Sequence, residues 1–205
     1  MSTDNLSIIR KQVISLPKKE SAKERILSVA FDLFYKEGIR VVGIDRIIEE
    51  SGVAKASFYR NFPTKDHLIV AYLERRSEVR LEAIEEVKRQ FPNSPKQQLY
   101  ALLEELVERM KSSHYRGCSF MNAIVEFPDE EHPGHQAAMV SRHKIWEQVE
   151  DIVRQAGARD PVQLTYQLQL LKEGAMMSGY MDKDAYHPDY FLDACKVLIE
   201  GQLPS

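Results

Sequence analysis

The chain has 205 residues, of which 43% are hydrophobic and 29% charged, a composition that supports a folded core and excludes an intrinsically disordered chain. The formal net charge is −3, and two cysteines, Cys118 and Cys195, are too few for a disulfide framework. With no apolar run of membrane-spanning length and no signal-peptide pattern, we expect a cytoplasmic protein without a membrane partner.

Almost every segment has the periodicity of an amphipathic helix and none alternates like a strand, so the sequence predicts an all-α fold of about nine helices. The first three helices are expected over residues 20–37, 45–51 and 55–62. A fourth follows the capping residue Thr64 and runs toward Phe91. At about 1.5 Å per residue it is roughly 40 Å long, so we expect it to link the two halves of the molecule.

Five further helices are expected after this long one. Ser94 and Asp160 each precede a proline and stand three residues before a glutamine, which is the pattern of an N-cap with a capping box. They introduce a helix after residue 94 and a helix that reaches about Met181. Between these two we expect a helix over 117–127, a loop over 128–134 and a helix over 135–156, and a last helix follows Pro188.

Ser51-Gly52-Val53-Ala54 joins two short helices in the pattern of a helix-turn-helix. Gly52 permits a left-handed backbone at the tight turn, and Val53 can fill the space between the helices. Phe58 and Phe62 are expected to point into the core, which leaves the other side of the second helix free for a major groove. Ala56 and Ser57 are small enough for close approach, and the side chains expected to reach bases or phosphates are Lys55, Tyr59, Arg60 and Lys65.

Charge is distributed in a way that suits this interpretation. Residues 1–73 hold 12 basic and 9 acidic side chains, whereas residues 74–205 hold 16 and 22. A basic N-terminal part fits a polyanionic partner. Lys18, Lys19, Lys23 and Arg25 form either an N-terminal arm that reaches the DNA backbone or a solvated helix face.

The stretch that contains Gly38, Ile44-Asp45-Arg46-Ile47 and residues 52–68 resembles the DNA-binding domain of the TetR family of transcriptional regulators. The resemblance covers about residues 20–73, and the spacing Tyr59-x-x-Phe62-x-x-Lys65-x-x-Leu68 makes it specific. Three positions depart from the family pattern. Gly43 replaces a threonine that caps a helix and touches phosphate, Ala54 replaces a capping serine or threonine, and Asn61 replaces a common histidine. Gly43 and Ile44 complete the residues expected at the DNA.

The resemblance implies a homodimeric, ligand-responsive repressor that binds a palindromic operator. It divides the chain into an arm over 1–19, a helix-turn-helix domain over 20–66 and a ligand-binding and dimerisation domain over 67–205. The last two long helices are expected to form a four-helix interface with their counterparts in a second subunit. The residues predicted for this interface are Leu164, Leu168, Leu171, Ala175, Ser178, Phe191 and Leu198.

Methionine and aromatic side chains in the C-terminal half are compatible with an ordinary core and with a pocket for a mostly apolar effector. Asn122 and His143 are expected to act as polar anchors in such a pocket, and Cys118 is a candidate redox or electrophile sensor, although packing is the commoner fate of such a cysteine. No cofactor is expected. The predicted lining residues are Cys118, Phe120, Met121, Asn122, Ile124, His143 and Trp146.

Two alternative functions remain at this point. A helical metal-dependent enzyme would use His132-x-x-His135 with the neighbouring carboxylates, but this spacing matches no closed ligand set and no common catalytic motif is present. We therefore expect no catalytic residue and no metal. The other alternative is a DNA-binding protein without a ligand, whose interior is filled by side chains.

Overall fold

The structure, a computed structural model, describes residues 20–182 and 186–204. The described residues form nine α-helices and no β-strand, which confirms the predicted all-α fold. The expected arm over residues 1–19, with Lys18 and Lys19, lies outside the described residues. None of the described helices combines the length and the hydropathy that crossing a membrane requires.

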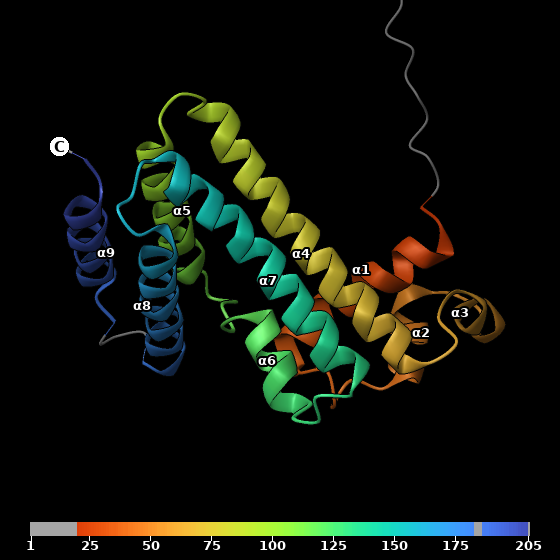
Figure 1. The fold of residues 1–205 in the computed structure, drawn as a ribbon. Helices are drawn as coiled ribbons and strands as arrows, with labels where there is room; N and C mark the ends of the chain where they lie inside the picture. Colours follow the sequence, from red (N-terminus) through yellow and green to blue (C-terminus); the bar gives the residue numbers. More distant parts are fainter. Residues whose placement is uncertain (1–19, 183–185, 205) are drawn as a thin grey trace, which may run out of the picture.

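Three short helices form one end of the molecule: α1 (Ala22–Glu37), α2 (Ile44–Ser51) and α3 (Lys55–Asn61). From this end α4 (Lys65–Gln90) crosses the molecule, and α7 lies along it (Figure 1). Beyond α7 the chain adds α8 and α9, while α6 packs near α1. The remaining helices are α5 (Pro95–Met110), α6 (Ser119–Glu126), α7 (Pro133–Gln155), α8 (Pro161–Met181) and α9 (Pro188–Gln202).

The helix starts confirm some predicted caps and correct others. Thr64 and Asp160 cap α4 and α8 by accepting hydrogen bonds from backbone N–H groups three residues later. Ser94 is the N-cap residue of α5 and Pro95 is its first residue, as predicted, but the Ser94 side chain bonds no N–H group of the helix. Helix α7 begins two residues earlier than predicted because the ring of His132 accepts from the N–H of Gly134 at 3.0 Å. These corrections move helix ends by a turn or less and leave the architecture unchanged.

Two hydrophobic clusters form the core, and the first of them extends across residue 66, the predicted boundary between the two domains. The first contains the buried side chains of α1 to α3 and the start of α4, and it also includes Phe120 and Ala123 of α6 and Ala138 of α7. The second lies between the far part of α4 and helices α5, α7, α8 and α9. The helix-turn-helix therefore packs directly on elements of the C-terminal part.

Polar contacts reinforce the junction between the two parts. The Glu126 carboxylate at the end of α6 accepts from the backbone N–H groups of Ile39 and Arg40 at 3.0 and 2.7 Å. The Tyr35 hydroxyl donates to the carbonyl of Gly117 at 3.1 Å and accepts from the N–H of Arg116 at 3.0 Å. These bonds tie α1 and the turn after it to both ends of the segment that contains α6.

Gly52 provides a direct test of the turn that positions α3. Its φ of 61° and ψ of 30° lie in the left-handed region, which costs other L-residues about 1–2 kcal/mol. We expect Gly52→Ala to lower the free energy of unfolding by about that amount, measured by urea denaturation at fixed protein concentration. Gly52→Asn is the matched control and should lose less, since asparagine tolerates this conformation. Equal losses for both variants would contradict a conformational cause.

Candidate DNA interface and ligand cavity

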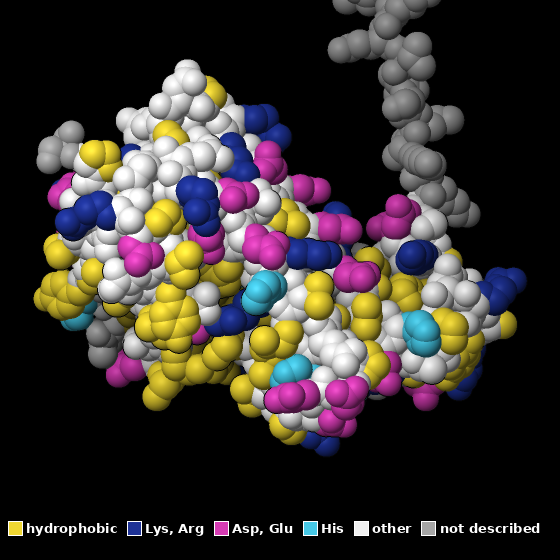
Figure 2. Space-filling model, in the orientation of Figure 1, with side chains coloured by type: hydrophobic (Ala, Val, Ile, Leu, Met, Phe, Trp, Pro, Cys, Tyr) yellow, Lys and Arg dark blue, Asp and Glu magenta, His cyan; other side chains and the backbone are white. Residues whose placement is uncertain are grey.

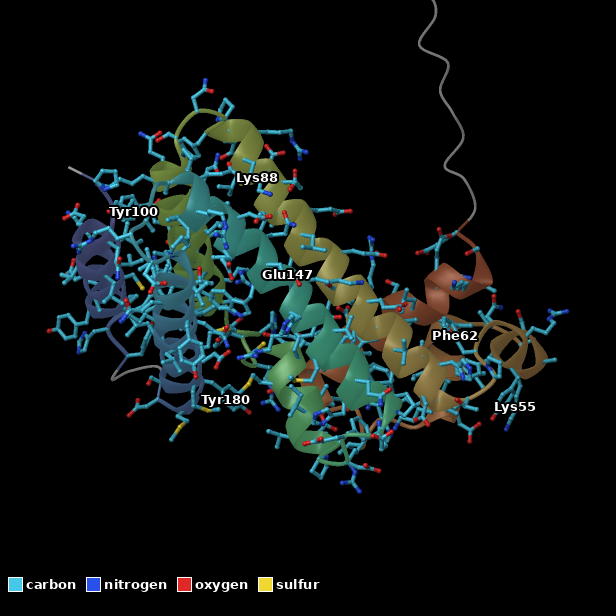
Figure 3. All side chains as sticks on the ribbon, in the orientation of Figure 1. Lys55, Phe62, Lys88, Tyr100, Glu147 and Tyr180 are labelled. Carbon is cyan, nitrogen blue, oxygen red and sulfur yellow. The ribbon has the colours of Figure 1, made fainter. Side chains whose placement is uncertain are left out.

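Helix α3 has one buried face and one exposed face, as the sequence predicts. Phe58 is fully buried and Phe62 is 3% exposed, and Val53 fills the turn before the helix. Lys55 projects from the end of the molecule, away from the core (Figure 3). The side chains left facing outward are those of Lys55, Ala56, Tyr59 and Arg60, with Ser57 half-buried beside them.

The two cations of this surface have different surroundings. The Lys55 ammonium lies 3.2 Å from the Asp45 carboxylate in the first turn of α2, and this hydrogen bond raises the pKa of Lys55. Arg60 has no ion-pair partner among the described residues. The guanidinium of Arg60 is thus available to another partner, whereas Lys55 would have to give up its bond to Asp45 before it could bind a phosphate or a base.

The other predicted DNA contacts lie where α2 and α4 begin. Lys65 is half-buried: its ammonium donates to the carbonyl of Arg40 at 3.3 Å, and burial lowers its pKa. Gly43 is exposed at the N-cap of α2 and Ile44 is half-buried against the first cluster. Arg25, from the predicted basic cluster, donates to the carbonyls of Ser51 and Gly52 at 3.3 and 3.4 Å. The side chains of Lys65 and Arg25 therefore already donate hydrogen bonds to backbone carbonyls in the turns that flank α2.

A cavity of about 400 Å³ is lined by α4, α5, α7 and α8, by the segment before α6 and by Tyr35 of α1. Of the predicted pocket residues, Cys118, Phe120 and Trp146 line it. Met121 and Asn122 instead line a second cavity of about 300 Å³ near α1, which Cys118 also touches.

The prediction of Ile124 and His143 as pocket residues is not supported by either cavity. Ile124 packs against the first hydrophobic cluster because this side of α6 faces the helix-turn-helix. His143 is exposed on α7. The Asn122 amide donates to the carbonyl of Arg116 at 2.9 Å, so one of its donors supports the preceding segment.

Charged residues in the larger cavity were missed by the sequence analysis. The Glu105 carboxylate lies 3.3 Å from Arg80 and 3.5 Å from Arg109, and Glu173 pairs with Arg142. One sequence signal could have found them. Arg80 stands four residues before the buried Ile84, so both lie on the same side of the helix and the arginine is placed next to the core. The charged lining residues are Arg76, Arg80, Glu105, Arg109, Arg142, Lys172 and Glu173.

Burial affects two of these cations directly. Burial, and secondarily the charge of Arg80, lower the pKa of Arg109 to about 10. Burial also lowers the pKa of Lys172, whose ammonium lies 4.9 Å from the centroid of the Trp146 ring. The charged form of both side chains is therefore destabilised by the surrounding protein.

The histidines of the proposed metal loop have other partners. The His132 ring caps α7 and stacks on Phe127, and the His135 ring nitrogen is 2.8 Å from the carbonyl oxygen of Phe127. Within the part of the chain that the structure describes, no group of three or more His, Cys, Asp or Glu side chains is placed to hold a metal ion.

The apolar surface of α8 and α9 differs from the predicted dimer interface. Leu164, Leu168, Ala175 and Phe191 are buried inside the protomer, so they cannot face a partner; Leu171 and Leu198 are half-buried and Ser178 is exposed. Hydrophobic side chains gather over this side of the molecule (Figure 2). The exposed ones are Val162, Tyr166, Leu170, Met177, Tyr180 and Met181 on α8, and Tyr190 and Val197 on α9.

Comparison with known proteins gives consistent matches over both parts of the chain. The family model described as "Bacterial regulatory proteins, tetR family" matches residues 26–72, and that described as "Tetracyclin repressor-like, C-terminal domain" matches residues 95–195. The HTH-type transcriptional regulator YjdC of Escherichia coli K12 is 24% identical over 159 residues, which are 75% of this chain and 81% of that protein.

Solved structures extend the similarity to the whole fold. A TetR-family transcriptional regulator from Streptomyces coelicolor is 32% identical with a TM-score of 0.82, over 88% of this chain and 95% of that chain. A transcriptional regulator from Saccharomonospora viridis, solved in complex with choline, shares the fold with a TM-score of 0.73 at 18% identity, over 90% of this chain and 98% of that chain.

The recognition helix lacks one stabilising contact that a single substitution can restore. Ala54 occupies the N-cap with an extended backbone and makes no side-chain hydrogen bond. We expect Ala54→Ser to raise the free energy of unfolding by about 1 kcal/mol, measured by urea denaturation, because the serine hydroxyl can accept from a free N–H of α3. Ala54→Val, which adds volume without a cap, should bring no gain. A gain of similar size from valine would exclude capping as the cause.

Proposed function

Because the chain belongs to the TetR family of transcriptional regulators, we propose that it is a homodimeric repressor, released from a palindromic operator by a small molecule bound in the larger cavity. The observation that carries the proposal is the combination of an exposed recognition surface on α3 with a cavity of about 400 Å³ behind α4. Its relatives and its fold are those of transcriptional regulators and not of enzymes. A protein that binds operator DNA would act in the cytoplasm.

Operator binding would combine two kinds of contact. Ala56 and Ser57 allow α3 to enter the major groove closely, where Arg60 and Lys55 can read base edges. Tyr59 and the N-termini of α2 and α4, beside Gly43, Ile44 and Lys65, would bind phosphates and fix the register of the protein on DNA. Neutralising several phosphates makes the affinity fall steeply with salt.

Dimerisation would use the exposed side of α8 and α9. Tyr166, Leu170 and Val197 are 59%, 52% and 71% exposed, and a monomer rarely leaves so many large apolar side chains together in water. Gly174 of α8 is also exposed, with nothing within 4 Å of a Cβ built on it, so a second helix can approach closely there. A two-fold axis through this side would set the spacing between the two recognition helices.

Release would follow from the contacts between the cavity wall and α1. Arg76 lines the cavity and also donates to the carbonyl of Phe31 at 2.9 Å, and Tyr35 lines the cavity from α1 itself. A ligand that favours a different position of these side chains would shift α1, on which α2 and α3 pack. The cavity supports this function over a DNA-binding protein without a ligand.

Arg60 provides the test of the recognition surface. We expect Arg60→Ala to weaken binding to an operator selected from random DNA by about 1–3 kcal/mol, since a bidentate contact to guanine is lost. The measurement is a titration by fluorescence anisotropy at two salt concentrations. Arg89→Ala is the control, because Arg89 is exposed near the far end of α4 and pairs only with Glu86. Unchanged operator affinity in Arg60→Ala would exclude Arg60 from the interface.

Leu170 tests the proposed dimer face. We expect Leu170→Arg to shift the protein from dimer to monomer in sedimentation velocity, because the charged side chain would be desolvated between two subunits. Val41→Arg is the matched control: Val41 is 77% exposed in the turn between α1 and α2, and its variant should remain dimeric. A dimer of unchanged stability in Leu170→Arg would remove this face from the interface.

A further inference from the structure

The charged residues of the larger cavity gather at one of its ends. In α4 the lining arginines Arg76 and Arg80 precede Ile84, and in α5, which runs back along the bundle, Leu99 precedes Arg109 (Figure 1). The second helix pair repeats this order: Arg142 precedes Trp146 and Val149 in α7, while Leu168 precedes Lys172 in α8. Helices α4 and α7 run in one direction and α5 and α8 run in the other (Figure 1), so the charges meet at the end nearest α6, beside Phe120 and Met176. The apolar side chains of Ile84, Leu99, Val149 and Leu168 meet at the other end.

The charged end holds more cations than anions. Its lining includes the four arginines Arg76, Arg80, Arg109 and Arg142 with Lys172, against the two carboxylates of Glu105 and Glu173. Glu105 is shared between Arg80 and Arg109, and Glu173 is paired with Arg142.

This imbalance leaves specific cations without full compensation. The Nε of Arg109 is buried without a hydrogen-bond partner, although it lies 3.5 Å from Glu105. Lys172 forms no ion pair with any described residue and faces the Trp146 ring. Since burying a cation without a partner costs free energy, and burial lowers the pKa of both side chains, an additional anion at this end would stabilise them.

We propose that the effector is an amphipathic carboxylate, with its carboxylate among Arg76, Arg80 and Arg109 and its apolar body toward Leu99 and Trp146. The assignment rests on the proposed ligand-responsive function and narrows the mostly apolar effector expected from the sequence. A planar carboxylate matches the paired donors of a guanidinium, and a cavity of about 400 Å³ is within the range of small-molecule sites. A neutral ligand leaves the cations uncompensated, and a cation such as an alkylamine is repelled.

A ligand carboxylate bound at the charged end would affect DNA binding through Arg76, which contacts α1. The guanidinium of Arg76 lies 3.6 Å from the centroid of the Phe31 ring and 4.4 Å from that of Tyr35, and it donates to the Phe31 carbonyl. All three contacts are with α1. A carboxylate bound at this end competes with the Phe31 carbonyl for the same donors, so binding of the anion and the position of α1 are linked.

The test compares three probes of one chain length: decanoate, decanol and decylamine, each below its micelle-forming concentration. Trp146 is the only tryptophan of the chain and lines the cavity, so its fluorescence reports binding to the full-length protein. We expect decanoate to bind about tenfold or more tighter than decanol, and decylamine to bind most weakly. Equal affinities for decanoate and decanol, or no saturable binding of decanoate, would overturn the proposal.

Arg109→Gln and Arg89→Gln form the matched pair of variants. Arg109→Gln should weaken decanoate about tenfold while leaving decanol unchanged, and Arg89→Gln, outside the cavity, should change neither. Unchanged decanol binding shows that the variant cavity is folded; if Arg109→Gln loses both ligands, Arg80→Gln replaces it in the same comparison. Decanoate affinity that stays unchanged in a folded variant would overturn the role of the cations.

A second readout separates this inference from the proposed function. Decanoate is added to the protein bound to its selected operator, and DNA release is followed by anisotropy. Binding to the cavity without any release would contradict the ligand-responsive function while leaving the anion site in place. Release by decanol with the same potency as by decanoate would support the function and overturn the anionic effector.

Discussion

Helix α4 contributes buried side chains to both hydrophobic clusters, and the arrangement of the whole molecule depends on this. Leu68, Tyr72 and Leu73 belong to the cluster beneath the recognition helix, whereas Ile84 belongs to the cluster between the C-terminal helices. A hydrogen-bonded helix of 26 residues cannot rotate at one end without turning at the other. Arg76 lies between the two sets, where the helix passes the charged end of the cavity. The surface that meets DNA and the space that holds a ligand therefore share one rigid wall.

The charged side chains of the cavity affect both the stability of the protein and the kind of ligand that it can bind. A core filled only with leucine and methionine would be more stable than one that contains Arg109 and Lys172, because their burial is opposed by desolvation. Glu105 and Glu173 offset part of that cost by pairing with arginines. The cations that remain uncompensated give the cavity a preference for anionic ligands. The same buried cations thus lower the stability of the folded protein and increase its specificity for an anionic ligand.

The sequence was most informative where local chemistry decides the outcome. Gly38 and Gly52 end α1 and α2 at positive φ, and Phe58 and Phe62 face inward, because turn conformation and helical spacing fix both features. Prediction failed where the outcome depends on packing between distant helices. Helix α8 is apolar on most of its circumference, so its pattern could not tell the buried Leu164 and Leu168 from the exposed Tyr166 and Leu170. The cavity arginines come from three helices, and only the fold brings Arg80, Arg109 and Arg142 to one end.

A ligand changes the affinity for DNA only by as much as it distinguishes two arrangements of the protein. A purely apolar molecule in this cavity would contact Leu99 on α5 and Trp146 on α7, whose side chains form no hydrogen bond to the described residues of α1, α2 or α3. An anion at the other end contacts residues that also hold α1, because Arg76 and Tyr35 bond to Phe31 and to the segment before α6. That segment leads into α6, whose Glu126 binds the turn between α1 and α2. The charged end is therefore the place from which a small ligand has the shortest physical route to the DNA-binding surface.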